Sequence, residues 1–272
     1  MPETSRKTYA LVTGAASGLG AAFLAELARR GFHIIGVSRP GDDVKSVVNA
    51  LAARHGVEGI GMDLDLSQSG CATELRNQVK AAGVQVEILI NNVGIGGTSE
   101  FIESDHADNR LMMELNMRTT VEMCREFAPE MVANRRGCIL NVSSMAANFP
   151  MPYKSIYTAS KAFVKSFSIG LRSEMKPFGV NVSVVQPGAM LTNPVVVEQL
   201  RHGSAMSRVS AMRPGDVAAF ALDKAFKGKA VIIPGFKNWL TLGILRVFPR
   251  PLKTTLAVYN HLKTQRKSIP KK

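Results

Sequence analysis

The chain has few cysteines and no long apolar run. Its three cysteines, Cys71, Cys124 and Cys138, are odd in number and unclustered among 272 residues. That pattern indicates neither a disulfide framework nor a zinc site. No stretch approaches the roughly 20 consecutive apolar residues of a membrane-spanning helix. The opening MPETSRKTYALVTG leaves no room for the apolar core of a signal peptide. We therefore expect no metal, no secretion and a cytoplasmic location.

Acidic residues are absent from one end of the chain. Between Lys237 and Lys272 there are nine basic residues and no Asp or Glu, within a net charge of +13. The basic residues alternate with apolar ones, which is typical of basic amphipathic helices. We expect such an extension over 236–272, and three roles stay open for it. It covers the substrate mouth or a partner subunit, or it makes peripheral contact with an anionic membrane. Nucleic-acid binding is the weakest alternative, because no recognition module accompanies the charge.

The remainder alternates short β-rich runs with longer helical patterns, an order that predicts a parallel sheet with crossover helices. The first helix is expected over Gly18 to Arg30, ending at Gly31. The expected strands lie near 9–13, 33–38, 57–62, 88–91, 137–143, 180–186 and 230–233. We predict an α/β fold: a single-domain, Rossmann-type, doubly wound parallel sheet of about seven strands flanked by helices. This catalytic domain would span 1–235, with a cofactor half over about 1–137 and a catalytic and substrate half over about 138–235.

A glycine-rich turn follows the first expected strand and opens directly into a helix. It reads Thr13-Gly-Ala-Ala-Ser-Gly-Leu-Gly20. Glycine permits the tight turn, the close approach of a pyrophosphate and the packing of helix on strand, while the helix N-terminus attracts the phosphate charge. The alternative is a structural turn, but the strand-turn-helix context favours binding. The predicted cofactor contacts in this turn are Gly14, Ala16, Ser17, Gly18, Leu19 and Gly20.

The second expected strand ends in Ser38 and Arg39, where an NAD site usually carries an acidic residue. A carboxylate would repel a ribose 2′-phosphate, whereas Ser donates a hydrogen bond and Arg a charge-assisted one. These residues therefore predict NADP(H). The alternative for Arg39 is a surface arginine that begins a turn.

Two further strand ends supply polar groups. After the third strand, Asp65 is expected beside the adenine amino group, with Leu66 next to it, although Asp-Leu-Ser is also typical of a helix N-cap. After the fourth strand, the amide of Asn92 is expected to tie strands together and, with Gly94, to line the ribose.

Tyr157 and Lys161 lie four residues apart, which places both on one face of a helix. A free phenol has a pKa near ~10, and a neighbouring cation favours its phenolate. Ser144, thirteen positions earlier, carries a hydroxyl that can bind a substrate carbonyl oxygen. Asn116 is the remaining polar candidate, either a satisfied core residue or one that bends its helix and holds a water. These four residues are the predicted catalytic set.

In these motifs the chain resembles short-chain dehydrogenases/reductases, from about Tyr9 to Ile233. The match comprises TGAASGLG, NNVG, Asn116, Ser144, YTASK, and Pro187-Gly188 with Thr192. The resemblance implies that Tyr157 is the general acid/base and that Lys161 binds the nicotinamide ribose and lowers the phenol pKa. It further implies that Ser144 positions the carbonyl and Asn116 a water. Pro187, Gly188 and Thr192 would contact the nicotinamide.

NNVG, the run GCILNVSS and the basic, apolar C-terminus are similar to the branch that reduces long-chain 3-oxoacyl-CoA thioesters and 17-ketosteroids. Val93 departs from the alanine common in the family. The Val- and Met-rich segment 189–214 is expected to be a substrate lid suited to a lipophilic ketone or alcohol. The resemblance implies a homodimer or homotetramer. The alternatives are a non-catalytic dinucleotide-sensing or scaffold protein, and an enzyme for a small polar carbonyl or sugar.

Overall fold

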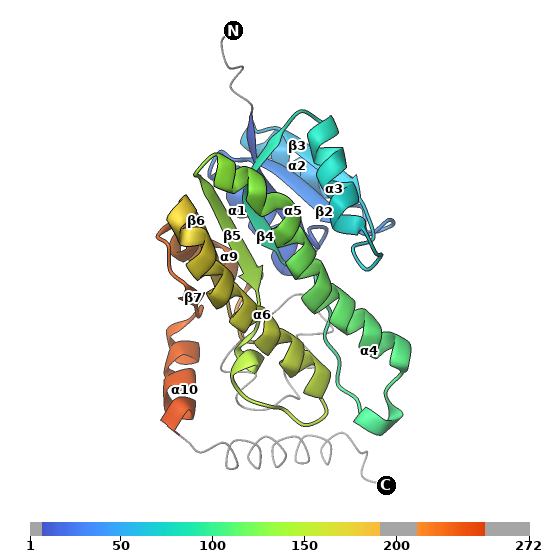
Figure 1. The fold of residues 1–272 in the computed structure, drawn as a ribbon, viewed down its shortest axis with the longest axis vertical. Coiled ribbons are helices and arrows are strands. Elements are labelled where there is room, and N and C mark those ends of the chain that lie inside the picture. Colours follow the sequence, from blue (N-terminus) through green and yellow to red (C-terminus); the bar gives the residue numbers. More distant parts are fainter. Residues whose placement is uncertain (1–6, 191–210, 248–272) are drawn as a thin grey trace.

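The structure, a computed structural model, describes residues 7–190 and 211–247, with side chains described as far as residue 243. Strands and helices alternate along this chain (Figure 1). The strands are β1 (Thr8–Thr13), β2 (His33–Ser38), β3 (Gly59–Asp63), β4 (Gln85–Asn91), β5 (Gly137–Val142), β6 (Val180–Val185) and β7 (Val231–Ile232). The helices are α1 (Gly18–Arg29), α2 (Val44–His55), α3 (Cys71–Ala81), α4 (His106–Met113), α5 (Thr119–Ala133), α6 (Ser155–Met175), α9 (Pro214–Phe226) and α10 (Phe236–Val247).

The strands form one parallel sheet in the order β3-β2-β1-β4-β5-β6-β7. The chain winds outward from β1 in one direction and then resumes at β4 in the other. Neighbouring crossovers therefore diverge between β1 and β4, leaving a crevice at the carboxyl ends where ligands of such sheets bind. The predicted fold class is confirmed.

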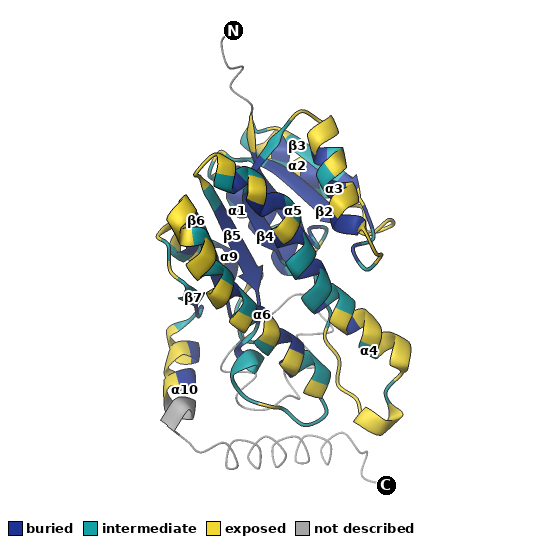
Figure 2. Ribbon diagram, in the orientation of Figure 1, coloured by how far each residue is buried: buried dark blue, intermediate teal, exposed yellow. Residues whose placement is uncertain are grey.

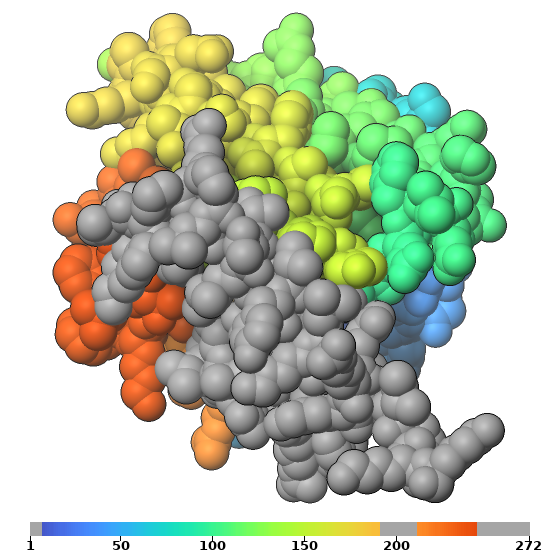
Figure 3. Space-filling model, turned by 90° about the horizontal axis from the view of Figure 1, so that it is seen from below, coloured from blue at the N-terminus to red at the C-terminus, as the bar shows by residue number. Residues whose placement is uncertain are grey.

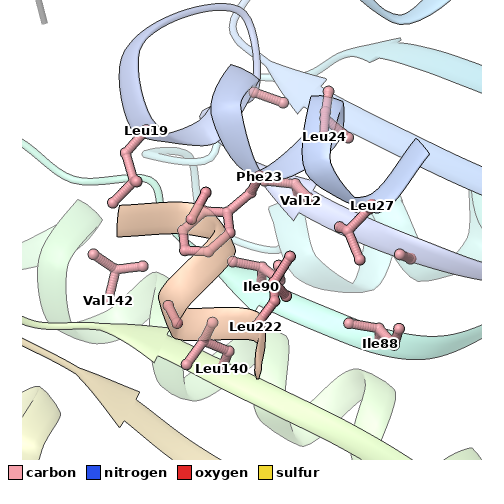
Figure 4. Close-up of a cluster of buried hydrophobic side chains, with 14 of the residues drawn as sticks. Val12, Leu19, Phe23, Leu24, Leu27, Ile88, Ile90, Leu140, Val142 and Leu222 are labelled. Carbon is pink, nitrogen blue, oxygen red and sulfur yellow. The ribbon is translucent and has the colours of Figure 1, made fainter. Parts of the chain in front are cut away.

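Both faces of the sheet are buried, because crossover helices cover each of them (Figure 2). Alternate residues of one strand therefore enter different cores: Ala10 and Val12 lie in one cluster and Leu11 in the other. The first cluster packs β1, β4 and β5 against α1, α2 and α9, and Figure 4 shows Phe23, Ile90 and Leu222 among its side chains. The second packs α3, α5 and α6 on the opposite face. Because apolar clusters pack on both faces of the sheet, the strand ends that carry the polar motifs are held in place.

The expected element boundaries differ from the observed ones mainly at β3 and β4. The third strand begins at Gly59, not Val57, because Gly56 adopts a left-handed conformation and the Val57 N–H closes α2 by donating to the Ala52 carbonyl. The fourth begins at Gln85, earlier than the predicted Ile88. Both strands still end where the polar motifs begin.

The predicted lid and C-terminal extension are described only in part. Residues 191–210, which include Thr192, lie outside the described residues, as do 248–272. The two ends of the lid segment meet: Met190 and Met212 form a parallel bridge, and the Met212 N–H donates to the Ala189 carbonyl at 3.0 Å.

Helix α10 starts at the residue where the extension was predicted to begin. It buries Asn238 and Leu242 against the body. In Figure 3, which views the carboxyl-end face, α10 borders one side of that face and α4 the other. Among the described helices, none is both long and apolar enough to cross a bilayer. The division of the chain at 235/236 stays a prediction.

Candidate active site

The glycine-rich turn between β1 and α1 depends on its glycines. Gly14 and Gly18 have φ angles of +63° and +56°, which strain residues with a side chain. A Cβ on Gly20 would lie 2.0 Å from the Gly14 carbonyl oxygen. The loop therefore folds onto its own helix only with these residues.

The N-terminus of α1 has no side-chain cap, so its N–H groups are available to an anion. Ser17 is the N-cap residue, yet its hydroxyl makes no capping hydrogen bond, and the first turn carries no acidic side chain. The first N–H groups of a helix lack intrahelical partners and sit at its positive end. This local chemistry fits a phosphate group.

Ser38 and Arg39 lie beside that turn but are already engaged. Ser38 is buried, and its Oγ accepts a hydrogen bond from the Ala16 N–H at 3.0 Å, which joins β2 to the loop. The Arg39 side chain is 74% exposed, and its Nε lies 3.2 Å from both carboxylate oxygens of Asp42. Sequence reasoning missed Asp42, although its place three residues after Arg39 was a usable signal. A 2′-phosphate at Arg39 would compete with this carboxylate.

Asp65 closes a turn at the end of the pocket beyond β3. Its carboxylate accepts hydrogen bonds from the Ser67 N–H, the Ser67 hydroxyl and the Gln68 amide, at 2.8–3.0 Å. The Gln68 and Ser67 bonds hold the pKa of Asp65 below its usual range. The N-cap interpretation was wrong in position, since α3 begins at Cys71 after Gly70. The carboxylate remains ionised at the pocket wall.

Asn92 ties β4 to β1, as predicted. Its side-chain amide donates to the carbonyls of Thr13 and Gly14 at 2.9 and 3.1 Å. The Thr13 hydroxyl in turn accepts from the Asn92 and Val93 N–H groups. The start of the next segment is therefore anchored to the glycine loop.

Asn116 lies fully buried within a π-helical stretch, Glu114–Arg118, between α4 and α5. Its amide oxygen accepts from the Ile95 N–H, and its amide nitrogen donates to the Ile95 carbonyl and to the Ser160 hydroxyl, at 2.9–3.0 Å. The predicted distortion of the helix is present. Both amide hydrogens of the side chain and one acceptor site of its oxygen are engaged, so it fixes the strand-end loop to α6.

Tyr157 and Lys161 share a face of α6, one turn apart. The Lys161 ammonium donates to the Val142 carbonyl at 3.1 Å, and burial lowers its pKa to about 8. Burial also raises the Tyr157 pKa above its usual value, while a hydrogen bond with Ser144 acts in the opposite direction. The Ser144 Oγ also accepts from the Ala146 N–H at 3.1 Å. The protein by itself thus keeps the phenol protonated.

One pocket of about 430 Å³ joins the glycine loop to the tyrosine helix. The predicted residues that line it are Gly14, Ala16, Ser17, Leu19, Ser38, Arg39, Asp65, Leu66, Asn92, Gly94, Tyr157 and Lys161. Gly18, Gly20, Asn116, Ser144, Pro187 and Gly188 are not among its lining residues. Lining residues that the prediction did not assign include Asp42, Ile95, Gly96, Ser143 and Met190. Most of these carry backbone or apolar contacts, which leave no motif in a sequence.

The residues that line the pocket fit a dinucleotide. Its glycine-rich turn and its phenol line the same hollow, and the wall between them admits no larger side chain at Gly94. A Cβ there would lie 2.5 Å from the Asn116 Oδ1 and 3.2 Å from the Lys161 Nζ. In residues 7–190 and 211–247, no group of three or more His, Cys, Asp or Glu is placed to hold a metal ion.

A family profile described as short chain dehydrogenase matches residues 8–202. Very-long-chain 3-oxoacyl-CoA reductase-A of Danio rerio is 36% identical over 183 residues, covering 66% of this chain and 57% of the relative. The chain spans 57–61% of the length of such curated relatives.

Among solved structures, a 7beta-hydroxysteroid dehydrogenase has a TM-score of 0.83 at 22% identity, covering 92% of this chain and 96% of that one. At that identity the likeness concerns the fold alone. A short-chain dehydrogenase from Sphingobium yanoikuyae in complex with NADPH has a TM-score of 0.74 at 26% identity, covering 89% and 96%.

Proposed function

Since the chain belongs to the short-chain dehydrogenase family, we propose that it is an NADP(H)-dependent oxidoreductase that interconverts a ketone and a secondary alcohol. The observation that carries this proposal is the meeting of a Ser144-bonded Tyr157 phenol and a buried Lys161 ammonium at one end of the pocket that begins at the glycine loop. A non-catalytic dinucleotide sensor has no need of this arrangement.

Tyr157 is the proposed proton donor in ketone reduction. Because burial raises its pKa, the phenol holds its proton at neutral pH and can release it to an oxygen that gains negative charge. The Ser144 hydroxyl binds the same oxygen and orients it. A bound nicotinamide supplies the hydride and, when oxidised, a positive charge.

Lys161 has two proposed roles, in proton transfer at Tyr157 and in binding the cofactor ribose. With a pKa of about 8 it is mostly protonated at neutral pH, and its bond to the Val142 carbonyl fixes the ammonium one helical turn from Tyr157. The cation favours the phenolate that alcohol oxidation requires. It also offers donors to a ribose hydroxyl, in the part of the pocket that Asn92 and Gly94 line.

Tyr157→Phe is the direct test. The variant keeps the ring but has no proton to transfer, so NADPH binding should persist while ketone reduction falls by roughly 10²–10⁴-fold. Tyr153→Phe is the matched control, a neighbouring phenol whose loss leaves the proposed acid in place. Equal turnover in Tyr157→Phe and the parent protein would contradict the mechanism.

The preference for NADP(H) is assigned to Arg39 and Ser38, with Asp42 as a competing partner of the arginine. Arg39→Ala should weaken NADPH binding far more than NADH binding. Asp42→Asn should act in the opposite direction and tighten NADPH by roughly 3–10-fold, since it frees the guanidinium at an exposed site. Titration of cofactor fluorescence measures both, and an unchanged NADPH/NADH ratio in either variant removes that residue from the role.

The proposed substrate is lipophilic, of the 3-oxoacyl thioester or ketosteroid class. Its support is the identity to very-long-chain 3-oxoacyl-CoA reductases and the apolar side chain of Met190, which lines the pocket and forms a bridge with Met212. NADPH oxidation against 3-oxoacyl thioesters, ketosteroids, sugars and small aldehydes tests this. Higher kcat/KM for a sugar or small aldehyde would overturn the substrate class and leave the reaction class intact.

A homodimer or homotetramer is proposed as the assembly. Helices α5 and α6 leave an apolar hollow of about 420 Å³ between them, lined by Val132, Phe167, Leu171 and Phe178 among others. Large exposed apolar surfaces mark interaction sites. Light scattering should give a multiple of the chain mass, and Leu171→Glu should reduce it to that of one chain.

Peripheral contact with an anionic membrane, from the cytoplasmic side, is proposed for 236–272. On α10, Phe236, Trp239 and Leu240 are exposed at helical spacing, opposite the buried Asn238 and Leu242. Aromatic residues beside basic ones suit the interface of a bilayer. Co-sedimentation with phosphatidylserine vesicles should fall on truncation at Phe236 and in Trp239→Ser. Equal binding before and after truncation eliminates the contact.

A further inference from the structure

A second lysine approaches the tyrosine from outside the cofactor pocket. The Lys154 Nζ lies 5.9 Å from the centroid of the Tyr157 ring, at the residue that precedes α6. Lys154 is partly buried, and burial lowers its pKa. In the described part of the chain no carboxylate pairs with it. The ring of Tyr157 is therefore the polarisable group that this cation faces.

The backbone holds Lys154 at this place. The Lys154 N–H donates to the Met151 carbonyl, and its own carbonyl accepts from the Thr158 N–H, at 3.1 and 2.9 Å. Tyr153, just before it, has a φ of +63° and accepts from the Ser99 N–H through its carbonyl. A left-handed non-glycine residue costs free energy and persists only where its surroundings fix it. Position 154 is thus built into the entry of α6.

Tyr157 separates two hollows. One is the cofactor pocket, and the other is a small space of about 30 Å³ lined by Lys154, Ser99 and Asn109 among others. Tyr157 is the residue that these two hollows share among their described lining residues. Lys161 approaches the tyrosine from the first side, and Lys154 from the second.

We propose that Lys154 is a positioning residue that favours the phenolate of Tyr157 through the ring face; the inference rests on the proposed acid/base role of that tyrosine. A cation within about 6 Å of an aromatic ring is attracted to its face, and the attraction grows when the ring gains negative charge. Lys154 therefore opposes the effect of burial on the phenol. Alcohol oxidation, which needs the phenolate, gains most from it.

The surroundings of Tyr157 allow the charge of Lys154 to have a large effect on the pKa of the phenol. Beside Lys154, the titratable residues that line the two hollows next to Tyr157 are Lys161 on the same helix and Tyr153 before it. Helix α4 and the π-helical stretch also pack against α6; they carry His106, Asp108, Arg110 and the Glu114–Arg118 ion pair, none of which lines either hollow. The facing segment 94–97 and Ser144 bring no titratable side chain. The pocket carboxylates, Asp42 and Asp65, follow β2 and β3 at the opposite edge of the sheet. A unit charge at this distance in a partly buried site shifts a pKa by about 1–2 units.

Direct titration of the phenol tests the proposal without substrate or cofactor. The chain has four tyrosines, and Tyr157→Phe assigns its resonance in a spectrum of protein labelled at the tyrosine Cζ. In Lys154→Met the Tyr157 pKa should rise by about 1 unit, and Lys154→Arg, which keeps the charge, should restore it. Lys224→Met is the matched control, because Lys224 lies 5.4 Å from the Phe220 ring on α9. It should leave Tyr157 unchanged.

Kinetics then separate this inference from the proposed function. In Lys154→Met the rising limb of kcat for alcohol oxidation should move to higher pH by the same shift, with KM little changed. The inference is overturned if the Tyr157 phenol titrates at the same pH in Lys154→Met as in the parent protein. Circular dichroism must show that the variant is folded, and Lys154→Gln must give the same unshifted titration. A rise in KM confined to anionic substrates with an unmoved pH profile also overturns the inference, since it would make Lys154 a substrate ligand. A shifted titration in a protein that reduces no ketone supports the inference and refutes the proposed function.

Discussion

Replacing Lys161 by Met is expected to abolish turnover and yet stabilise the fold at neutral pH. Lys161 is 6% exposed, and burial lowers its pKa from 10.5 to about 8. That difference corresponds to roughly 3 kcal/mol of penalty on the charged folded state at pH 7. Met fills a similar volume without the charge but loses the bond to the Val142 carbonyl, worth about 1 kcal/mol. The net gain in the free energy of unfolding is about 2 kcal/mol.

The gain should depend on pH in a defined direction. Between the folded pKa of about 8 and the unfolded value of 10.5, the unfolded chain binds more protons at this lysine. The stability of the parent protein therefore rises over that range relative to the variant. The advantage of Lys161→Met should be full at pH 7, shrink above pH 8 and vanish or reverse by pH 10.

Urea denaturation at pH 7 and pH 10 measures both quantities as differences between variant and parent, so that other titrating groups cancel. Lys227→Met, on an exposed residue after α9, is the control and should alter neither value. A variant that is no more stable than the parent at pH 7, with the same pH dependence, would refute the reasoning that Lys161 carries a desolvated charge.

Two further predictions concern packing and charge. Gly94→Ala places a Cβ 2.5 Å from the Asn116 amide oxygen and should lower the free energy of unfolding by about 2–4 kcal/mol. In the control Gly97→Ala, the new Cβ meets only the flexible end of Met112, so the variant should be as stable as the parent protein. Equal urea midpoints for the two variants would show that Gly94→Ala causes no clash. Glu26→Gln should cost about 1–2 kcal/mol at pH 7, because its partners Arg29 and Arg30 lower the Glu26 pKa from 4.5 to about 2. The ionised Glu26 carboxylate stabilises the fold above pH 4.5, and this stabilisation is lost as pH falls toward 2. Urea titrations should therefore show a smaller stability difference between parent and Glu26→Gln at pH 3 than at pH 7. The same difference at both pH values would contradict a lowered Glu26 pKa.

Patterns of short range determined much of this protein. The alternation of strands and helices predicted the sheet, because each element must bury an apolar face with its own period. The glycine loop lies within one turn and the pair Tyr157 and Lys161 on one helix, so local spacing predicts the shape of the loop and the shared helix face of the pair. The same locality revealed Arg39 at the end of β2.

Tertiary structure decided what each of these groups bonds to. Asn116 binds the backbone of Ile95, 21 residues away, and the hydroxyl of Ser160, 44 residues away. The Lys161 ammonium donates to a carbonyl on β5, and Lys154 rests against the ring of Tyr157. A sequence pattern carries periodicity and local chemistry, whereas a pKa depends on burial and on charges brought close by distant segments. The pKa values of Tyr157 and Lys161, and so the proton that the site can transfer, therefore depend on the tertiary structure.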